Sequence, residues 1–227
     1  MASEKRGSNF DKVKALRTAF HPNLKNPMSD APNFSFVMES KLAGMALPTS
    51  TYMMKRLKSE HNVGLVCSLI EASNCPPLSM FEVTEESPEE GPDSLLVEWK
   101  DMSIPTRQQM DALLKTTEEY INRGQAVVYH CFGGKGRTGT ALACYLLKYH
   151  SDTFNGDNVI EHLRELRPNS VETSSQELFV KNYEKYLKGE PLLPENTYSS
   201  SSDEEKPKFL TAKLRKVGIP TTASASE

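Results

Sequence analysis

The chain has 227 residues, 37% of them hydrophobic and 25% charged, with 27 Lys and Arg against 30 Asp and Glu. This length accommodates one sizeable domain with appendages or at most two small domains, and the formal net charge of -3 argues against a general nucleic-acid binder. No apolar stretch approaches the roughly 20 residues that span a bilayer, and the N-terminus lacks the apolar segment of a secretory signal. The 4 cysteines form no Cys-x-x-Cys pair, so neither a disulfide framework nor a metal site is indicated. We therefore expect a soluble cytoplasmic protein without a membrane span.

The charge is distributed unevenly and divides the chain into three parts. Residues 1–29 hold six basic and two acidic residues, residues 189–227 hold five and six, and residues 30–188 hold the remaining 16 and 22. The basic first part predicts a short amphipathic helix because its apolar residues share one face. These residues are Phe10, Val13, Leu16 and Phe20. The last part predicts a disordered tail of serine and acidic residues followed by a basic stretch. Phosphorylation of the serines and a nuclear address in the basic stretch stay open as alternatives to a solvated tail.

Residues 30–188 alternate between strand and helix patterns. Short apolar or alternating runs predict strands, and apolar residues three and four positions apart predict helices. In chain order the predicted elements are a strand at 34–38, a helix at 51–61, a strand at 63–70, an acidic and proline-rich loop at 71–94, a strand at 95–99, a helix at 110–121 closed by Gly124, a strand at 126–130, a buried helix at 138–149, and two helices that contain 159–166 and 178–187. This alternation favours an α/β domain with a central, mostly parallel sheet flanked by helices.

The residues with the clearest chemistry lie at the turn after the strand at 126–130. The segment is His130-Cys131-Phe132-Gly133-Gly134-Lys135-Gly136-Arg137-Thr138-Gly139. It is not a Walker A loop, because Tyr129 and Gly136 stand where Gly and Ser or Thr are needed. A dinucleotide-binding G-x-G-x-x-G matches Gly134, Gly136 and Gly139, but the required second strand, ending in an acidic residue about 20 positions on, is not predicted.

A third interpretation, a phosphate-binding loop that carries a nucleophilic cysteine, also accounts for Cys131, Arg137 and Thr138. Cys131 and Arg137 are separated by five residues, three of them glycine, at a helix N-terminus. Backbone N–H groups could therefore converge on one anion, with the helix dipole adding to their attraction. The same donors should stabilise a Cys131 thiolate and make it a nucleophile at neutral pH. Arg137 would hold two phosphoryl oxygens in a bidentate fork, and Thr138 would donate its hydroxyl to the Cys131 sulfur when the thiolate leaves.

The pattern His130-Cys131-x5-Arg137-Thr138 resembles the signature of the cysteine-dependent protein tyrosine phosphatase superfamily. Residues 32–37, 42–48, 141–146 and 167–176 extend the similarity to the atypical dual-specificity phosphatases, over residues 30–188. The resemblance implies a protein tyrosine phosphatase-like fold, a phosphate-binding loop between strand and helix, and no metal or other cofactor. It also implies that the loop binds phosphate through Phe132, Gly133, Gly134, Lys135, Gly136 and Arg137.

The resemblance further implies a general acid on a loop about 30 residues before the cysteine, since an alkoxide or phenoxide leaves poorly unless it is protonated. Asp101 matches this position because it follows the strand at 95–99, and Asp93 in the acidic loop is the alternative. His130 is expected either to orient the loop or to be an ordinary hydrogen-bonded structural histidine. By resemblance Gln176 positions the hydrolytic water and Glu172 contacts the loop or the acid region. The alternatives for these two are an ordinary first-turn helix residue and a helix cap.

The implied function is metal-independent hydrolysis of phosphomonoesters through a cysteinyl-phosphate. We expect a monomeric dual-specificity phosphatase that acts on phosphoproteins and has no nucleic-acid partner. Phosphoinositides or RNA 5′-phosphates remain alternative substrates, because the setting of Lys135 is similar to that in lipid-directed phosphatases and because the loop at 71–94 is unusually long. A phospho-binding adaptor is a further alternative, suggested by the basic arm and the tail. Cys144 is expected in the core, and spacing gives no support to a disulfide between an oxidised Cys131 and Cys67 or Cys75.

Overall fold

The computed structural model describes residues 31–75 and 91–192, so the predicted N-terminal helix, most of the acidic loop and nearly all of the tail lie outside the described residues. Within these ranges the strands form one sheet in the order β1-β2-β5-β3-β4, in which β1 is antiparallel to β2 and all other neighbours are parallel. The strands are β1 (Ser35–Met38), β2 (Leu42–Met45), β3 (Val63–Ile70), β4 (Asp93–Glu98) and β5 (Ala126–His130). The helices are α2 (Thr51–His61), α3 (Arg107–Asn122), α4 (Gly136–Tyr149), α5 (Val159–Leu166) and α6 (Ser174–Lys188), with a short 3-10 turn η1 (Ala72–Asn74).

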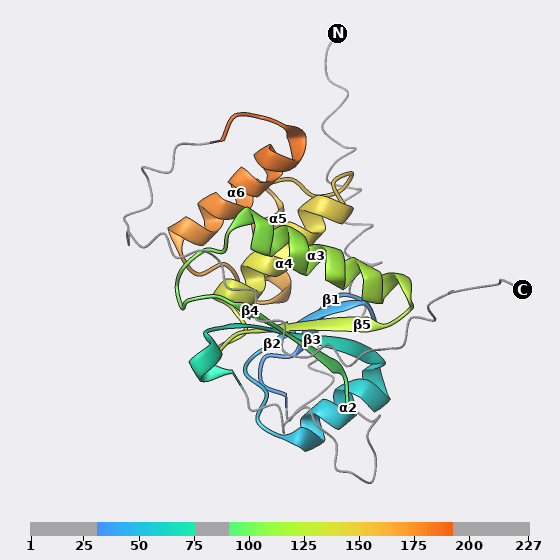
Figure 1. Cartoon of the computed structure of the whole chain (residues 1–227). Coiled ribbons are helices and arrows are strands. Elements are labelled where there is room, and N and C mark those ends of the chain that lie inside the picture. The colour runs from blue at the N-terminus through green and yellow to red at the C-terminus, as the bar shows by residue number, and fades with distance from the viewer. Residues whose placement is uncertain (1–30, 76–90, 193–227) are drawn as a thin grey trace, which may run out of the picture.

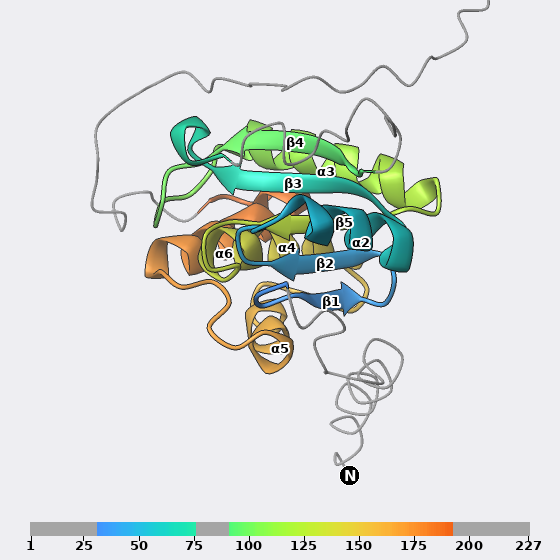
Figure 2. The ribbon, with the colours of Figure 1, turned by 90° about the horizontal axis from the view of Figure 1, so that it is seen from below.

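The helices lie on both sides of the sheet. Helices α3, α4, α5 and α6 lie on one side and α2 lies on the other (Figure 1). Seen from below, the strands cross the molecule in the order from β4 to β1, with α2 in front of them (Figure 2). The predicted α/β architecture with a mostly parallel sheet is therefore confirmed.

The central strand β5 contributes side chains to the hydrophobic cores on both faces of the sheet. Successive side chains of a strand point to opposite faces, so Val127 and Tyr129 enter the core beneath α3 and α4, while Ala126 and Val128 enter the core against α2. Burial of an aliphatic or aromatic side chain contributes about 1.5–3 kcal/mol relative to exposure. A short strand that is buried on both faces therefore anchors the chain firmly just before Cys131.

Several sequence-based boundaries differ from the structure. Strand β1 begins at Ser35 rather than at 34, and α3 spans Arg107–Asn122 rather than 110–121. Strand β4 begins and ends earlier than the predicted 95–99, and α4 begins two residues before the predicted 138. Strand β2 was not predicted, because all four of its residues are buried and it therefore shows no alternation of apolar and polar residues. The helix at 51–61 and the strands at 63–70 and 126–130 have the predicted bounds.

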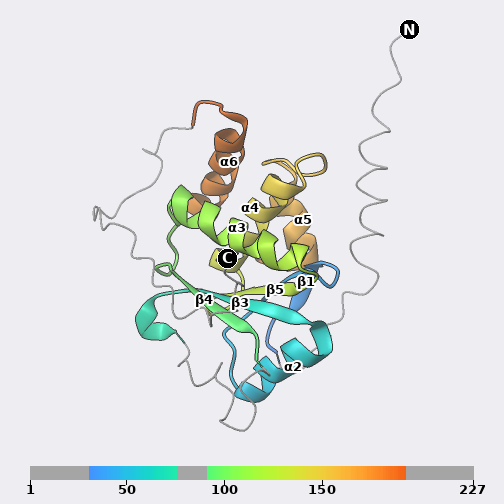
Figure 3. The same ribbon diagram turned by 45° about the vertical axis from the view of Figure 1, so that its right-hand side comes forward.

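The parallel strands β2, β5, β3 and β4 all end at one edge of the sheet, because neighbouring parallel strands run in the same direction. Figure 3 shows the sheet between its two helical layers. The segments that follow β2, β4 and β5 therefore meet at this edge, which is where ligands bind in open α/β sheets. Cys131 follows β5, and Asp101 follows β4.

Candidate active site

The loop from Cys131 to Arg137 has its backbone carbonyl groups hydrogen-bonded to surrounding elements. The Leu47 N–H donates to Phe132 O at 2.9 Å, and Asn33 Nδ2 donates to Gly133 O at 2.9 Å. Gly134 O accepts from Arg167 Nη2 at 2.6 Å, and Lys135 O accepts from the Gly139 N–H at 2.7 Å.

These bonds determine the direction in which the N–H groups of the loop point. In a planar trans peptide the N–H of one residue points away from the C=O of the residue before it. The N–H groups of Gly133, Gly134 and Lys135 therefore point away from the partners that hold the preceding carbonyls. The N-cap of α4, Lys135, offers no side-chain acceptor to the first turn of the helix. These N–H groups thus lie on the side of the loop away from its supports, an arrangement compatible with the anion cradle that the sequence analysis predicts.

Gly134 shows why glycine is needed in this loop. Its φ angle of +68° lies in the left-handed region, and a Cβ atom there would lie 2.3 Å from Met45 O. The loop therefore packs directly against the backbone that follows β2. Any side chain at this position would push the loop away from that support.

His130 is a buried neutral histidine rather than an exposed base. Its Nε2 lies 2.7 Å from Ser68 Oγ and its Nδ1 lies 3.3 Å from Cys131 O. Since a carbonyl oxygen only accepts, the Nδ1 atom carries the proton and Nε2 accepts from the Ser68 hydroxyl. Burial lowers the pKa of His130 from 6.5 to about 4, and the nearby Arg137 cation adds to this lowering. Ser68 was not noted in the sequence, although a lone serine in the apolar strand β3 was a usable signal.

The structure brings Arg137 and Asp101 together in an ion pair. The buried Arg137 guanidinium donates through Nη1 to Trp99 O at 2.8 Å, and its Nη2 lies 2.7 Å from Asp101 Oδ1. Its cation also lies 5.7 Å from the centre of the Phe132 ring. The Asp101 side chain is 59% exposed, so one end of this ion pair is open to solvent and to a ligand.

The alternative acid, Asp93, lies elsewhere. It begins β4, at the edge of the sheet opposite to the carboxyl ends of the strands, and it accepts a hydrogen bond from Tyr120 Oη at 2.6 Å. Asp101 lies on the segment that follows β4, where Met102 has a left-handed φ of 58° and donates its N–H to Asp101 Oδ1. The geometry therefore favours Asp101 over Asp93.

Glu172 and Gln176 both lie beside Gly136, but in different ways. The exposed Glu172 accepts the Gly136 N–H at 2.8 Å through Oε2, which brings a carboxylate to the rim of the loop. The buried Gln176 forms a capping box with Thr173 and donates through Nε2 to Ser103 O at 3.3 Å. The amide of Gln176 is thus occupied by structural bonds, and Glu172 is the one of the two that contacts the loop.

The remaining predicted residues have simpler surroundings. Thr138 Oγ1 is buried and has no hydrogen-bond partner within the described residues, so the predicted bond to the Cys131 sulfur is not formed here. Lys135 is half-buried in the loop, Cys144 is in the core as predicted, and the described cysteines are all free. In residues 31–75 and 91–192 we find no cluster of His, Cys, Asp or Glu that could hold a metal ion, and no helix long and apolar enough to cross a membrane.

Residues 31–180 match the family profile described as PTP-SAK, Swiss Army Knife protein, DSP-PTPase phosphatase domain. This match covers most of the described chain and includes Asp101, Cys131 and Arg137. The chain belongs to this phosphatase family. The superfamily membership predicted from the Cys131–Arg137 pattern is therefore confirmed.

Curated relatives include one phosphatase domain-containing protein and two uncharacterized proteins. An uncharacterized protein of Methanocaldococcus jannaschii is 39% identical over 92 residues, which are 40% of this chain and 58% of that protein. Protein tyrosine phosphatase domain-containing protein 1 of Mus musculus is 33% identical over 89 residues, 39% of this chain and 12% of that protein. A second uncharacterized Methanocaldococcus jannaschii protein is 30% identical over 159 residues, 69% of this chain and 80% of its own length. The chain thus spans little more than half of the first relative and about an eighth of the mouse protein.

Solved structures share the fold. Tk-PTP in its active form has a TM-score of 0.57 and 25% identity, covering 68% of this chain and 97% of that chain. PTPMT1 in complex with PI(5)P has a TM-score of 0.56 and 24% identity, covering 66% and 94%. These likenesses confirm the predicted protein tyrosine phosphatase-like fold.

Proposed function

We propose that the protein hydrolyses phosphomonoesters through a cysteinyl-phosphate on Cys131. The observation that carries the proposal is the support of the loop, in which the carbonyl groups of Phe132, Gly133 and Gly134 are hydrogen-bonded to surrounding elements, so that the N–H groups that follow them point away from these supports. Preorganised donors of this kind stabilise the charge on a transferring phosphoryl group without having to rearrange during the reaction. Cys131 and Arg137 stand at the two ends of the same loop, as nucleophile and phosphate clamp.

The first step transfers the phosphoryl group to the enzyme. The Cys131 thiolate attacks phosphorus, the S–P bond forms, and the bond from phosphorus to the leaving oxygen breaks. The Asp101 carboxyl group gives its proton to that oxygen. In the second step water attacks the cysteinyl-phosphate, the Asp101 carboxylate takes the proton from the water, and the S–P bond breaks. The products are an alcohol or phenol and inorganic phosphate, with Cys131 returned as the thiolate.

Substrate binding should also break the ion pair between Asp101 and Arg137. A phosphate dianion would compete for the Arg137 Nη2 that Asp101 holds at 2.7 Å. Arg137 favours such a bidentate ligand because its planar fork matches two phosphoryl oxygens. Binding would therefore release the Asp101 carboxylate from its cation. The carboxyl group would then be free to contact the leaving group of the substrate.

For the substrate we propose phosphotyrosine and phosphothreonine or phosphoserine in proteins. Phe132 in the loop and Met102 beside Asp101 are 44% and 56% exposed, so apolar groups border the anion site and can contact a substrate side chain. The segments at residues 32–37, 42–48, 141–146 and 167–176 add a closer similarity to atypical enzymes such as dual-specificity protein phosphatase 23. A phosphoinositide substrate is the second candidate, favoured by the half-buried Lys135 in the loop.

The test is hydrolysis of p-nitrophenyl phosphate in EDTA by the wild-type chain and by Cys131→Ser. We expect steady turnover by the wild type and none by the variant, because a hydroxyl at this position is far less nucleophilic than a thiolate. Wild-type turnover by Cys131→Ser would refute the mechanism, and tight phosphopeptide binding without any turnover would favour an adaptor. Phosphopeptides and phosphoinositides assayed side by side would then decide the substrate class.

A further inference from the structure

Arg167 is a fully buried arginine that holds the phosphate loop from behind. Its Nη1 donates to Asn33 O at 2.9 Å, to Ser35 Oγ at 2.6 Å and to Gly44 O at 2.8 Å. Its Nη2 donates to Gly134 O at 2.6 Å. One guanidinium therefore joins the start of β1 and the middle of β2 to the peptide between Gly134 and Lys135.

All of these acceptors are neutral, which is unusual for a buried cation. Among the described residues no carboxylate pairs with Arg167, and its Nε has no hydrogen-bond partner. Only 1% of the residue is exposed. Burial lowers the pKa of Arg167 to about 10, whereas the negative charge of Cys131 acts in the opposite direction. At neutral pH the guanidinium therefore remains charged.

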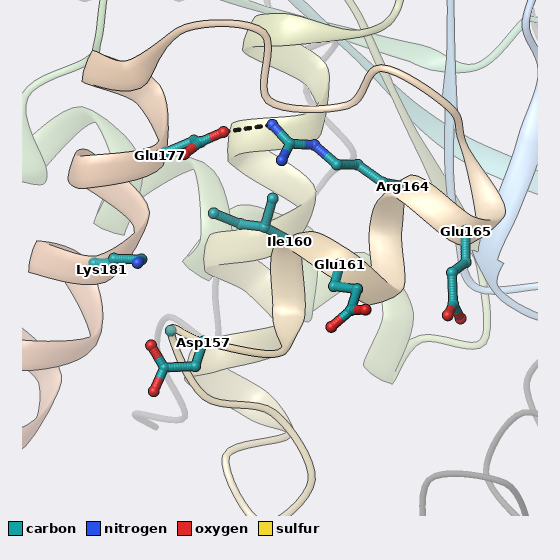
Figure 4. Close-up of a pocket in the computed structure, with 8 residues that line it drawn as sticks. Asp157, Ile160, Glu161, Arg164, Glu165, Glu177 and Lys181 are labelled. Carbon is teal, nitrogen blue, oxygen red and sulfur yellow. Dashed lines mark hydrogen bonds and ion pairs between the residues drawn. The ribbon is translucent and has the colours of Figure 1, made fainter.

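Arg164 shows how a structural arginine of the same helix differs. It also donates to backbone carbonyls, from Nε to Ser170 O at 3.0 Å and from Nη2 to Val171 O at 2.8 Å. It lies at a pocket between α5 and α6, where it pairs with Glu177 (Figure 4). Its side chain is 43% exposed, and its charge is paired with Glu177. Among the described residues the charge of Arg167 has no such partner.

We propose that Arg167 is a positioning residue for the phosphatase reaction, which fixes the Gly134–Lys135 peptide through its bond to Gly134 O and supplies positive charge on the buried side of the loop that begins at Cys131. The proposal rests on the function proposed above. A charge this deeply buried costs free energy unless an anion compensates it, and the thiolate and the bound phosphate are the anions available here. Arg137 meets the phosphate from the open side, and Arg167 acts through the loop without touching the substrate.

The test compares Arg167→Met and Arg167→Lys with the matched control Arg164→Met in the full-length chain. The rate of Cys131 alkylation by iodoacetamide is measured against pH, by mass spectrometry of the peptide that contains Cys131. The other charged groups near Cys131, which are Arg137, Lys135, Asp101 and Glu172, are unchanged in all three variants. Binding of inorganic phosphate is measured in parallel by calorimetry, and unfolding is followed by circular dichroism.

We expect Arg167→Met to move the midpoint of the alkylation curve upward by about 1–2 pH units, the usual effect of one nearby charge, and to weaken phosphate binding about tenfold or more. Arg167→Lys should leave the pH midpoint of alkylation close to that of the wild type. It should still weaken phosphate binding, because lysine lacks the planar fork that joins Gly134 to β1 and β2. Arg164→Met should leave the midpoint unchanged, whatever its effect on unfolding.

A folded Arg167→Met with the wild-type midpoint and phosphate affinity would overturn the proposal. If that variant does not fold, wild-type phosphate affinity in Arg167→Lys would overturn it instead. An equal shift in Arg164→Met would also overturn it, because the effect would then not be specific to Arg167. Failure of the proposed function gives a different result, namely a wild-type chain that binds phosphate and has a reactive Cys131 but hydrolyses nothing.

Discussion

The buried imidazole of His130 predicts a pH dependence of stability that can be assigned to a single residue. Burial lowers its pKa to about 4 in the folded state, whereas an unperturbed histidine has a pKa of 6.5. Between these two values the unfolded chain binds a proton at this position and the folded chain does not. The free energy of unfolding therefore falls as the pH is lowered from 6.5 towards 4, and the full stability is present above pH 6.5.

The size of this effect follows from the difference between the two pKa values. Each pH unit inside the window changes the free energy of unfolding by about 1.4 kcal/mol, so lowering the pH from 7.5 to 5 should remove about 2 kcal/mol through His130 alone. Carboxylates also titrate in this range. Their contributions are shared by a variant that differs only at position 130.

The matched variant is His130→Gln, whose amide keeps one donor and one acceptor but cannot titrate. Urea unfolding is measured for both proteins at pH 7.5 and pH 5. The stability advantage of the wild type over the variant should shrink by about 2 kcal/mol at the lower pH. A difference between the two proteins that does not change with pH would refute the reasoning. A His130 resonance that titrates near pH 6.5 in the folded protein would also refute it.

Three further predictions test the loop and the acid. Gly134→Ala should lower the free energy of unfolding by about 1–2 kcal/mol or more, since it forces a left-handed alanine against Met45 O. Gly133→Ala is the control and should be tolerated, because a Cβ atom there meets only Lys135 Cδ at 4.0 Å. Equal losses of stability in urea unfolding would refute the packing argument. Asp101→Asn should lower kcat about 10²–10⁴-fold on phenyl phosphate and much less on p-nitrophenyl phosphate, and equal losses would place the acid elsewhere. Asn33→Gly keeps the left-handed φ of 54° but loses the side-chain bonds to Gly133 O and Gly134 O, so inorganic phosphate should bind severalfold more weakly in calorimetry; unchanged affinity would show that the loop does not need this support.

Local patterns predicted the elements that have a clear period or clear ends. The helix at 51–61 begins after Ser50, whose side chain accepts from the Met53 N–H, and it ends at Asn62 in the left-handed conformation. Strand β2 escaped prediction because a strand buried on both faces carries no alternation, and its pairing with β5 is a long-range property. The start of β4 was hidden for a similar reason, since Asp93 belongs to the sheet only through its pairing with Leu65 of β3.

The part of the candidate site that the sequence predicts most directly is one short continuous segment. The Cys131–Arg137 spacing and the glycines between them indicate an anion cradle without any tertiary information. Asp101 was predicted from the resemblance to the phosphatase superfamily, which implies an acid after a strand about 30 residues before the cysteine. The supports of the cradle come from distant parts of the chain, and for that reason the sequence did not reveal them. Asn33 lies 100 or more positions away in the sequence from the loop carbonyls that it binds. Arg167 lies 33 positions away from the loop carbonyl of Gly134.

These supports also explain how an acidic domain can bind a dianion. Residues 30–188 carry 16 basic and 22 acidic residues, so their overall field repels phosphate. The attraction must therefore be local, and under the two proposals above it is divided between two arginines. Arg137 is paired with the exposed Asp101 and could exchange this carboxylate for a phosphate, whereas no carboxylate among the described residues pairs with the buried Arg167. A ligand would thus change the partner of Arg137 while the buried charge of Arg167 behind Gly134 stays constant. This division of roles requires that the two positions respond differently to Lys, with Arg137→Lys losing the phosphate clamp and Arg167→Lys keeping a reactive thiolate.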